Sequence, residues 1–310
     1  MKVSVIVSCF NGADVLPITI PSLLNQDYPE DLTEMILVDD ASTDETPSLL
    51  DNPEWLDRFT IIQHPENRGR TATRNSGIDA ATGDLLILMD CDIEVKPTFI
   101  SQHVERHGDK KTIGILSNVR PREMNSSDKY HRYLFFGRRG AQLVEENQPL
   151  PFRYFIMTCS SIKSSAVNDT GKFNEKLPGY GIDLEYAYRL WNHYPKGLFY
   201  SPEIVVYMHK LKTLNEALSD FRDYGRRNVP IILQEFPELA YCVGADFVSS
   251  ADGQLSLKTT LGALLINSIT TILAKMCLPL APYPLSNVLI RFLMLSAAAM
   301  GYRQSLKNNG

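Results

Sequence analysis

The first half of the chain repeats one pattern: a short apolar run, a polar stretch, and then a helical stretch with one polar face. Strands that alternate with helices form βαβ units, which build a mostly parallel sheet flanked by helices. The pattern predicts strands at 3–8, 35–38, 59–63, 85–89 and 113–118, and helices at 15–25, 43–50, 71–80 and 97–107. We therefore expect an α/β fold.

The rhythm changes near residue 120, but no linker-like stretch interrupts the chain before residue 240. We expect residues 1–240 to form one domain, with a ligand-binding half at 1–119 and a second half at 120–240. Residues 241–310 are predicted to form a separate helical tail, because two long apolar stretches there flank the proline-rich "LPLAPYP".

Polar side chains follow each of the first four predicted strands, in "CFNGAD", "VDDASTD", "QHPENRG" and "MDCD". Ligands of open α/β sheets bind beyond the carboxyl ends of the strands. The third of these loops continues into "RTATRNSG", which sets arginines at the start of a helix, where an anion gains from the helix N-terminus. These strand ends are therefore the predicted binding site.

Asp90 and Asp92 end the fourth apolar run with one residue between them. Side chains two apart on an extended chain point the same way, so both carboxylates can face one point. Carboxylate oxygens suit Mg²⁺ or Mn²⁺, which also bind phosphate oxygens. A solvated pair of turn aspartates is the alternative interpretation of this pair taken alone.

Composition narrows the class of partner and the compartment. A net charge of −5 and a pI near 5.7 give no argument for nucleic-acid binding. The five cysteines are dispersed without CxxC spacing, which is typical of reduced thiols in the cytosol. The first strand begins almost at residue 1, which does not fit a secretory signal, so we expect a cytoplasmic protein.

The motifs in order resemble those of family-2 glycosyltransferases. The resemblance rests on "SVIVSCFNGADVLPITIPSLLNQDYP", "ILVDDASTDET", "NRGRTATRNSGIDAATGD", "LILMDCD" and "GKFNEKLPGYGIDLEYAYRL", and it spans about residues 3–210. It implies the GT-A (Rossmann-like) fold and inverting transfer from a nucleoside-diphosphate sugar with Mn²⁺ or Mg²⁺. UDP is the donor nucleotide that the resemblance favours, whereas the donor sugar and the acceptor, a glycan or a lipid-linked saccharide, stay open.

The resemblance also implies roles for individual residues. Asp183 would be the catalytic base, which takes the proton of the acceptor hydroxyl. His209 would join Asp90 and Asp92 at the metal. The nucleotide sugar would contact Phe10, Asn11, Asp39, Arg74, Asp90 and Tyr180.

Two departures from the family pattern bear on function. Ile182 stands before Asp183 where many relatives carry an acid, which puts some sugar contacts in doubt. The chain has no Q-x-x-R-W motif, so we expect transfer of a single sugar rather than polymerisation. A sugar nucleotidyltransferase and a non-catalytic sugar-nucleotide or glycan-binding protein of the same fold are the alternatives. A sugar nucleotidyltransferase would usually have a glycine-rich phosphate loop at the position of "CFNGAD".

The apolar tail raises the question of a membrane. The uncharged stretch 259–274 is shorter than the roughly 20 apolar residues that a spanning helix needs. We expect a helical hairpin that contacts the inner face of the cell membrane peripherally through residues 257–303. A packed core hairpin, an oligomer interface and a true membrane span are the alternatives.

Overall fold

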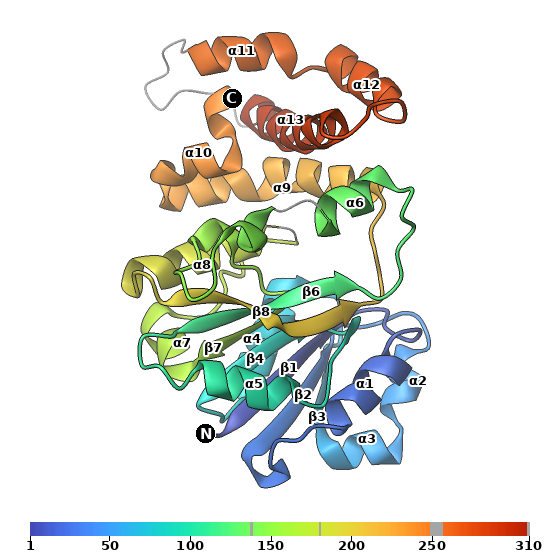
Figure 1. The fold of residues 1–310 in the computed structure, drawn as a ribbon, viewed down its shortest axis with the longest axis vertical. Coiled ribbons are helices and arrows are strands. Elements are labelled where there is room, and N and C mark those ends of the chain that lie inside the picture. Colours follow the sequence, from blue (N-terminus) through green and yellow to red (C-terminus); the bar gives the residue numbers. More distant parts are fainter. Residues whose placement is uncertain (137–138, 180, 249–256, 309–310) are drawn as a thin grey trace. The chain divides into compact units, whose positions relative to one another are not determined.

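The computed structural model describes residues 1–136, 139–179, 181–248 and 257–308 (Figure 1). The chain divides into two compact units, which are considered separately. Unit 1 comprises Met1–Glu123, Arg138–Glu175 and Asp183–Lys210, and unit 2 comprises Met124–Gly137, Lys176–Ile182 and Leu211–Gly310. The predicted division at residue 240 stays a prediction.

Unit 1 contains an eight-stranded mixed sheet in the order β3-β2-β1-β4-β7-β6-β8-β5 (Figure 1). Strands β3, β2, β1 and β4 are parallel, as the βαβ pattern predicts, and β6 is parallel to β8. Strand β7 is antiparallel to β4 and β6, and β5 is antiparallel to β8. The strands are β1 Val3–Cys9, β2 Thr33–Asp39, β3 Phe59–Gln63, β4 Leu85–Asp90, β5 Ile93–Glu94, β6 Gly114–Pro121, β7 Cys159–Lys163 and β8 Leu198–Met208.

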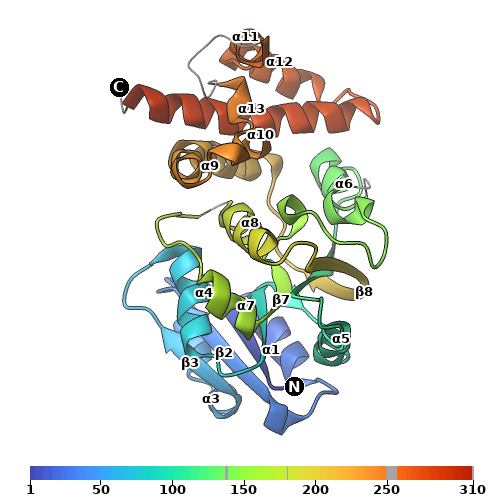
Figure 2. The same ribbon diagram turned by 90° about the vertical axis from the view of Figure 1, so that its left-hand side faces the viewer.

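The helices of unit 1 cover both faces of this sheet (Figure 2). Alternation along β1 sends Val3, Val5 and Val7 into a core with the helices of one face, and Ile6 into the core of the other. The first face carries α1 Leu16–Leu24, α3 Pro53–Arg58 and α5 Phe99–Arg106; the second carries α7 Ser164–Thr170 and α8 Ile182–His193. Helices α2 Thr46–Leu50 and α4 Gly69–Ala80 complete the predicted set.

Helix α4 approaches the sheet unusually closely. A Cβ added at Gly77 would overlap the Ile6 side chain of β1, so the glycine lets the helix backbone lie against the strand. This contact fixes the height of α4 above the strand ends, and α4 carries Arg70 and Arg74.

Unit 2 is helical. Tyr130 and Tyr133 pack with Leu218 and Ile290 in its core. Its helices are α6 Lys129–Phe135, α9 Leu214–Glu235, α10 Ala240–Val243, α11 Leu257–Leu265, α12 Ser268–Cys277 and α13 Leu285–Asn308. Among the described residues, the short 3-10 turns of unit 1 are Glu30–Leu32, Gly140–Leu143 and Phe152–Tyr154, and those of unit 2 are Pro237–Leu239 and Ala245–Phe247.

The predicted C-terminal hairpin is not clear in the structure, whereas one long apolar helix, α13, is. The first predicted arm is two helices, because Asn267 has an extended backbone and caps α12 through the amides of Ile269 and Thr270. Within the described residues, α13 alone is long and apolar enough to cross a membrane, and 44% of its apolar window is buried inside the structure.

Helix α13 packs against α9 with the two backbones in contact. A Cβ added at Gly225 of α9 would overlap the carbonyl oxygen of Ala298, and one at Gly301 of α13 would overlap that of Arg222. Glycines on both helices therefore allow α13 to lie directly against α9 within unit 2.

Gly301→Ala tests this packing, because helix propensity and the contact with α9 predict changes in stability of opposite sign. Helix propensity alone would stabilise the protein by about 1 kcal/mol. The overlap with Arg222 should instead destabilise it by roughly 1–3 kcal/mol, as overpacking does. Urea unfolding would measure the difference, with Gln304→Ala on the exposed face of α13 as the matched control. A more stable Gly301→Ala protein would contradict the packing.

Candidate active site

The carboxyl ends of β1, β2 and β4 meet at one edge of the sheet, as the parallel register requires. Asp39 ends β2 and Asp90 ends β4. Asp183 lies in the first turn of α8. These ends bring most of the predicted site residues into unit 1.

Arg74 links two of the predicted carboxylates. Its guanidinium lies 2.9 Å from Asp183 Oδ1 and 3.4 Å from Asp90 Oδ1, and it donates to the Met157 carbonyl at 3.1 Å. Arg74 is 3% exposed, whereas the Asp90 and Asp183 side chains are 21% and 24% exposed. A buried cation therefore holds two carboxylates that both keep a face open to solvent.

The turn that carries Asp90 and Asp92 is held by backbone hydrogen bonds on both sides. The Asp90 amide donates to the Thr158 carbonyl at 3.0 Å, and the Cys91 amide donates to Ser8 at 3.0 Å. The Asp92 carbonyl accepts from the His209 amide at 2.9 Å. Strands β1 and β8 and the segment before β7 thus fix the path of this turn.

Asp92 is harder to ionise than an ordinary aspartate, because its carboxyl group is largely buried and lies near Asp90. Burial and the neighbouring charge of Asp90 raise its pKa to about 6, although Arg70 and Lys210 act in the opposite direction. A divalent cation between the two carboxylates would remove this repulsion, and oxygen donors are the ligands that Mg²⁺ and Mn²⁺ prefer. The two carboxylates are thus oxygen donors of the kind that such an ion prefers.

His209, the third predicted metal ligand, has another partner here. Its Nε2 lies 2.8 Å from Glu94 Oε2, and Arg122 also approaches Glu94 at 3.5 Å. Within the described ranges, no three His, Cys, Asp or Glu side chains gather into a set that could hold a metal. Metal binding by Asp90, Asp92 and His209 stays a prediction.

The predicted base-binding residues lie in loops that are hydrogen-bonded to each other. Asn11 has a φ of +52° and accepts from the Thr43 amide at 2.8 Å. Asp39 is 2% exposed and accepts from the Ser42 hydroxyl and amide. Phe10 is 47% exposed at the end of β1. Tyr180 lies outside the described residues, and the nucleotide contacts of all four residues stay predictions.

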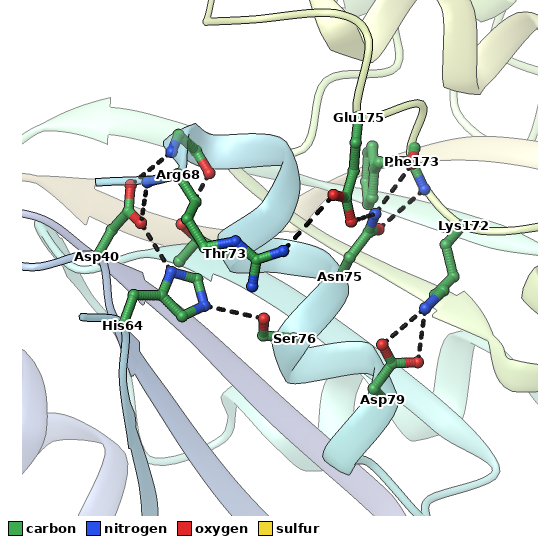
Figure 3. Close-up of polar contacts among 11 residues, drawn as sticks. Asp40, His64, Arg68, Thr73, Asn75, Ser76, Asp79, Lys172, Phe173 and Glu175 are labelled. Atoms are coloured by element: carbon green, nitrogen blue, oxygen red, sulfur yellow. Dashed lines mark hydrogen bonds and ion pairs between the residues drawn. The ribbon is translucent and has the colours of Figure 1, made fainter. Parts of the chain in front are cut away.

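Asp40 holds the N-terminus of α4, a role that the sequence analysis missed. Its carboxylate accepts from the amides of Arg68 and Gly69 at 2.8 Å each, and His64 Nδ1 lies 2.7 Å from it (Figure 3). His64 Nε2 in turn lies 2.9 Å from the Ser76 hydroxyl. The second aspartate of "DD" is therefore a structural residue that fixes the helix bearing Arg74.

The other face of α4 is held by Asn75. Its amide donates to the Phe173 carbonyl at 3.0 Å and to Glu175 at 2.9 Å, and it accepts from the Phe173 amide at 3.0 Å (Figure 3). The Phe173 ring then lies 5.5 Å from the Arg74 guanidinium. The sequence offered one signal for this contact: Asn75 is a polar residue in the middle of a predicted helix that follows an arginine-rich loop.

Lys210 is a second residue that the sequence analysis missed. Its ammonium lies 2.6 Å from Asp14 and donates to the Asn11 carbonyl at 3.0 Å. Its charge also favours ionised Asp92. The signal was a lysine directly after His209, at the end of a strand.

The fold and these strand ends define an α/β protein with a carboxylate- and arginine-lined site at the carboxyl edge of its sheet. The sequence profile of Glycosyl transferase family 2 matches residues 4–171, more than half of the chain. The chain belongs to this family, which confirms the resemblance stated from its motifs.

Two named bacterial relatives match over a shorter segment. EpsH of Bacillus subtilis (strain 168) is 34% identical over 116 residues, 37% of this chain and 33% of that protein. The succinoglycan biosynthesis protein ExoO of Rhizobium meliloti (strain 1021) is 36% identical over 108 residues, 34% of this chain and 29% of that protein. The matched segments span less than half the length of either relative.

Solved structures share the GT-A-like fold over the whole chain. Residues 1–349 of TarS from S. aureus give a TM-score of 0.60 at 16% identity, covering 100% of this chain and 92% of that one. A mannosyltransferase from Pyrobaculum calidifontis, solved with GDP-Man and Mn²⁺, gives 0.62 at 18%, covering 100% and 88%. The predicted α/β, GT-A-like fold is therefore confirmed, whereas the predicted C-terminal hairpin is not clear.

A double-mutant cycle tests the Arg74–Asp183 contact. Arg74→Met, Asp183→Asn and the double variant should show a coupling of roughly 0.5–3 kcal/mol in the free energy of unfolding, because the two groups interact directly. Urea unfolding would measure it. Arg74→Met combined with Asp57→Asn, an exposed residue of α3, is the control cycle and should be additive. Additivity in both cycles would mean that the contact does not exist.

Proposed function

We propose that the protein is an inverting glycosyltransferase that moves a single sugar from a nucleoside-diphosphate sugar to an acceptor hydroxyl. The observation that carries this proposal is the Arg74 bridge between Asp183 and Asp90. It unites the predicted proton acceptor with the predicted diphosphate–metal side of the site. Membership of the family supports the same reaction class.

Asp183 is the proposed general base. The acceptor oxygen attacks the anomeric carbon and its proton passes to the Asp183 carboxylate, while the bond from that carbon to the diphosphate oxygen breaks. An alcohol is a weak nucleophile until a base accepts its proton in the transition state. The contact with Arg74 orients this carboxylate before the substrate arrives, and its 24% exposure leaves it open to an acceptor. Attack opposite the leaving group inverts the anomeric centre.

Asp90 and Asp92 are the residues that we propose to hold Mn²⁺ or Mg²⁺. When bound, the ion neutralises charge that develops on the departing diphosphate. The raised pKa of Asp92 supports this assignment, because ionising it beside Asp90 is unfavourable without a cation. His209 would have to leave Glu94 before it could act as a third ligand.

The proposed donor is a UDP-sugar. The S. aureus TarS fragment has been solved with UDP-GlcNAc and the P. calidifontis mannosyltransferase with GDP-Man, which supports nucleotide sugars as the ligand class. Phe10, Asn11 and Asp39 are the proposed contacts to the base. Asp39 would either exchange its hydrogen bonds with Ser42 for one to the ligand, or keep them and position Ser42 to contact the ligand.

The proposed acceptor is a growing glycan or a lipid-linked saccharide at the cytoplasmic face of the cell membrane. The name of ExoO, a succinoglycan biosynthesis protein, supports a role in polysaccharide assembly. Exposed apolar side chains within residues 257–303 support a peripheral membrane location.

Asp183→Asn should lower kcat by roughly 10²–10⁴-fold, the usual contribution of a general base. Donor binding should be retained, because the proposed role of this residue is on the acceptor side. Rapid-quench transfer assays and calorimetric titration of UDP-sugars would separate the two quantities. The matched control is Asp79→Asn, which removes only an exposed ion pair with Lys172. Full transfer by Asp183→Asn would exclude this mechanism.

Metal removal probes the other side of the site. Chelation by EDTA should abolish donor binding by the wild-type protein, and Mn²⁺ should restore it. Asp92→Asn should bind donor weakly with or without Mn²⁺, because one of the two proposed ligands is lost. Thermal stabilisation by a panel of sugar nucleotides would report binding and identify the donor. Donor binding that ignores EDTA would argue for a metal-independent site.

A further inference from the structure

Helix α12 is apolar on two opposite faces. Ala274 and Leu278 are buried in the core of unit 2, which accounts for one face. The other face is exposed although it carries large apolar side chains: Ile269 71%, Ile272 57%, Leu273 53%, Met276 69% and, just beyond the helix, Leu280 88%. Their spacing of three and four residues places them on a single stripe.

Large exposed apolar side chains also stand before and after α12 in the chain. Leu264 and Leu265 of α11 are 66% and 53% exposed, and Tyr283 in the connection to α13 is 73% exposed. Soluble monomers rarely expose a contiguous apolar surface of this kind, and such a patch marks a contact with a protein or a membrane. We call Leu264, Leu265, Ile269, Ile272, Leu273, Met276 and Leu280 the apolar stripe.

Charge identifies the kind of partner. Residues 257–308 contain five lysines and arginines and no aspartate or glutamate, although the whole chain carries a net charge of −5. Lys275 is exposed on α12 itself. An apolar stripe within a purely basic segment is typical of helices that lie in the interface of an anionic membrane.

A pocket of about 290 Å³ adjoins the end of the apolar stripe, because Leu280 of the stripe lines it together with Tyr283. Lys129 and Arg132 of α6 also line it, together with Ser286 and Asn287 at the start of α13. The Lys129 ammonium donates to the carbonyls of Leu278, Pro279 and Ala281, which fixes the pocket wall. The Arg132 side chain is exposed and, within the described part of the chain, makes no hydrogen bond or ion pair, whereas the Arg132 backbone amide is bonded to the Asp128 carbonyl.

We infer that unit 2 binds an anionic phospholipid bilayer, with the apolar stripe in the acyl boundary and a lipid phosphate in the pocket lined by Arg132. The inference deepens the proposed membrane location and is independent of the proposed chemistry, because none of these residues belongs to the candidate active site. A planar guanidinium beside hydroxyl and amide groups suits a phosphate, and an amphiphile satisfies pocket and stripe together.

Flotation of the full-length protein tests the stripe. Wild type should bind vesicles of 70% phosphatidylcholine and 30% phosphatidylglycerol, and less tightly vesicles of phosphatidylcholine alone. Ile272→Glu with Met276→Glu should weaken partition by about tenfold or more, since two exposed apolar groups are lost to the bilayer. Leu56→Glu on α3, 54% exposed in unit 1, is the matched control and should float like wild type. Equal flotation of all three proteins would overturn the inference.

Arg132→Gln tests the pocket. It should weaken binding to phosphatidylglycerol vesicles by about fivefold, the effect of one basic residue near a membrane surface, and leave binding to neutral vesicles unchanged. Arg132→Lys should recover most of the loss. Equal weakening on both vesicle types, or no weakening at all, would overturn the pocket assignment.

Other occupants of the stripe and pocket give different results. Stabilisation by inorganic phosphate that Arg132→Gln abolishes, without flotation, would indicate a free-phosphate site. Dimers in sedimentation that Ile272→Glu with Met276→Glu dissociates, again without flotation, would indicate a second copy of the chain. Resistance to alkaline carbonate extraction would indicate a membrane-spanning α13. Each of these results would overturn the inference, whereas release by carbonate supports it.

Donor hydrolysis in detergent-free buffer separates a failure of this inference from a failure of the proposed chemistry. Hydrolysis should be unchanged in the Ile272→Glu, Met276→Glu variant.

Discussion

The contact on which the candidate site depends is the Arg74 guanidinium between Asp183 and Asp90. Two carboxylates from different elements would repel each other at this edge of the sheet, and the guanidinium between them, which is 3% exposed, offsets that repulsion. The cost of burying the arginine is met by its hydrogen bonds to both acids and to the Met157 carbonyl. Much of the remaining structure serves to hold this one side chain in place.

Helix α4 holds it through contacts on every side. Gly77 permits close packing on β1, Asp40 and His64 fix the N-terminus, and Asn75 fixes the Phe173 segment. Asp92, in contrast, is left with an unfavourable neighbour and a raised pKa. The site therefore contains one carboxylate pair that a buried cation bridges, Asp90 and Asp183, and a second pair, Asp90 and Asp92, in which Arg70 and Lys210 offset the repulsion only in part. The second pair is where an added cation would gain most.

The sequence predicted the parallel half of the sheet because each strand is a short apolar run that ends in polar residues. The predicted strand at 85–89 ends one residue before β4 does, because Asp90 is polar and the apolar run stops at Met89. Antiparallel β7 was not predicted as such, since strand direction depends on distant partners that periodicity does not encode. In the site, residue types and strand ends indicated Asp90 and Asp92, whereas Asp183 was indicated by the resemblance to the family. They could not indicate that Arg74 would face the acids, or that Glu94 would hold His209, because those choices depend on tertiary packing.

The C-terminal segment illustrates a different limit of sequence analysis. Both α12 and α13 are apolar helices, and hydropathy alone does not tell which of their faces are buried. Packing separates them. Glycines bring the backbone of α13 into contact with that of α9. Helix α12 instead turns Ala274 toward the core and its large apolar side chains toward solvent. A helix of a soluble core would carry polar residues on that outer face. The apolar outer face therefore implies a partner for α12, while α13 already has one in α9.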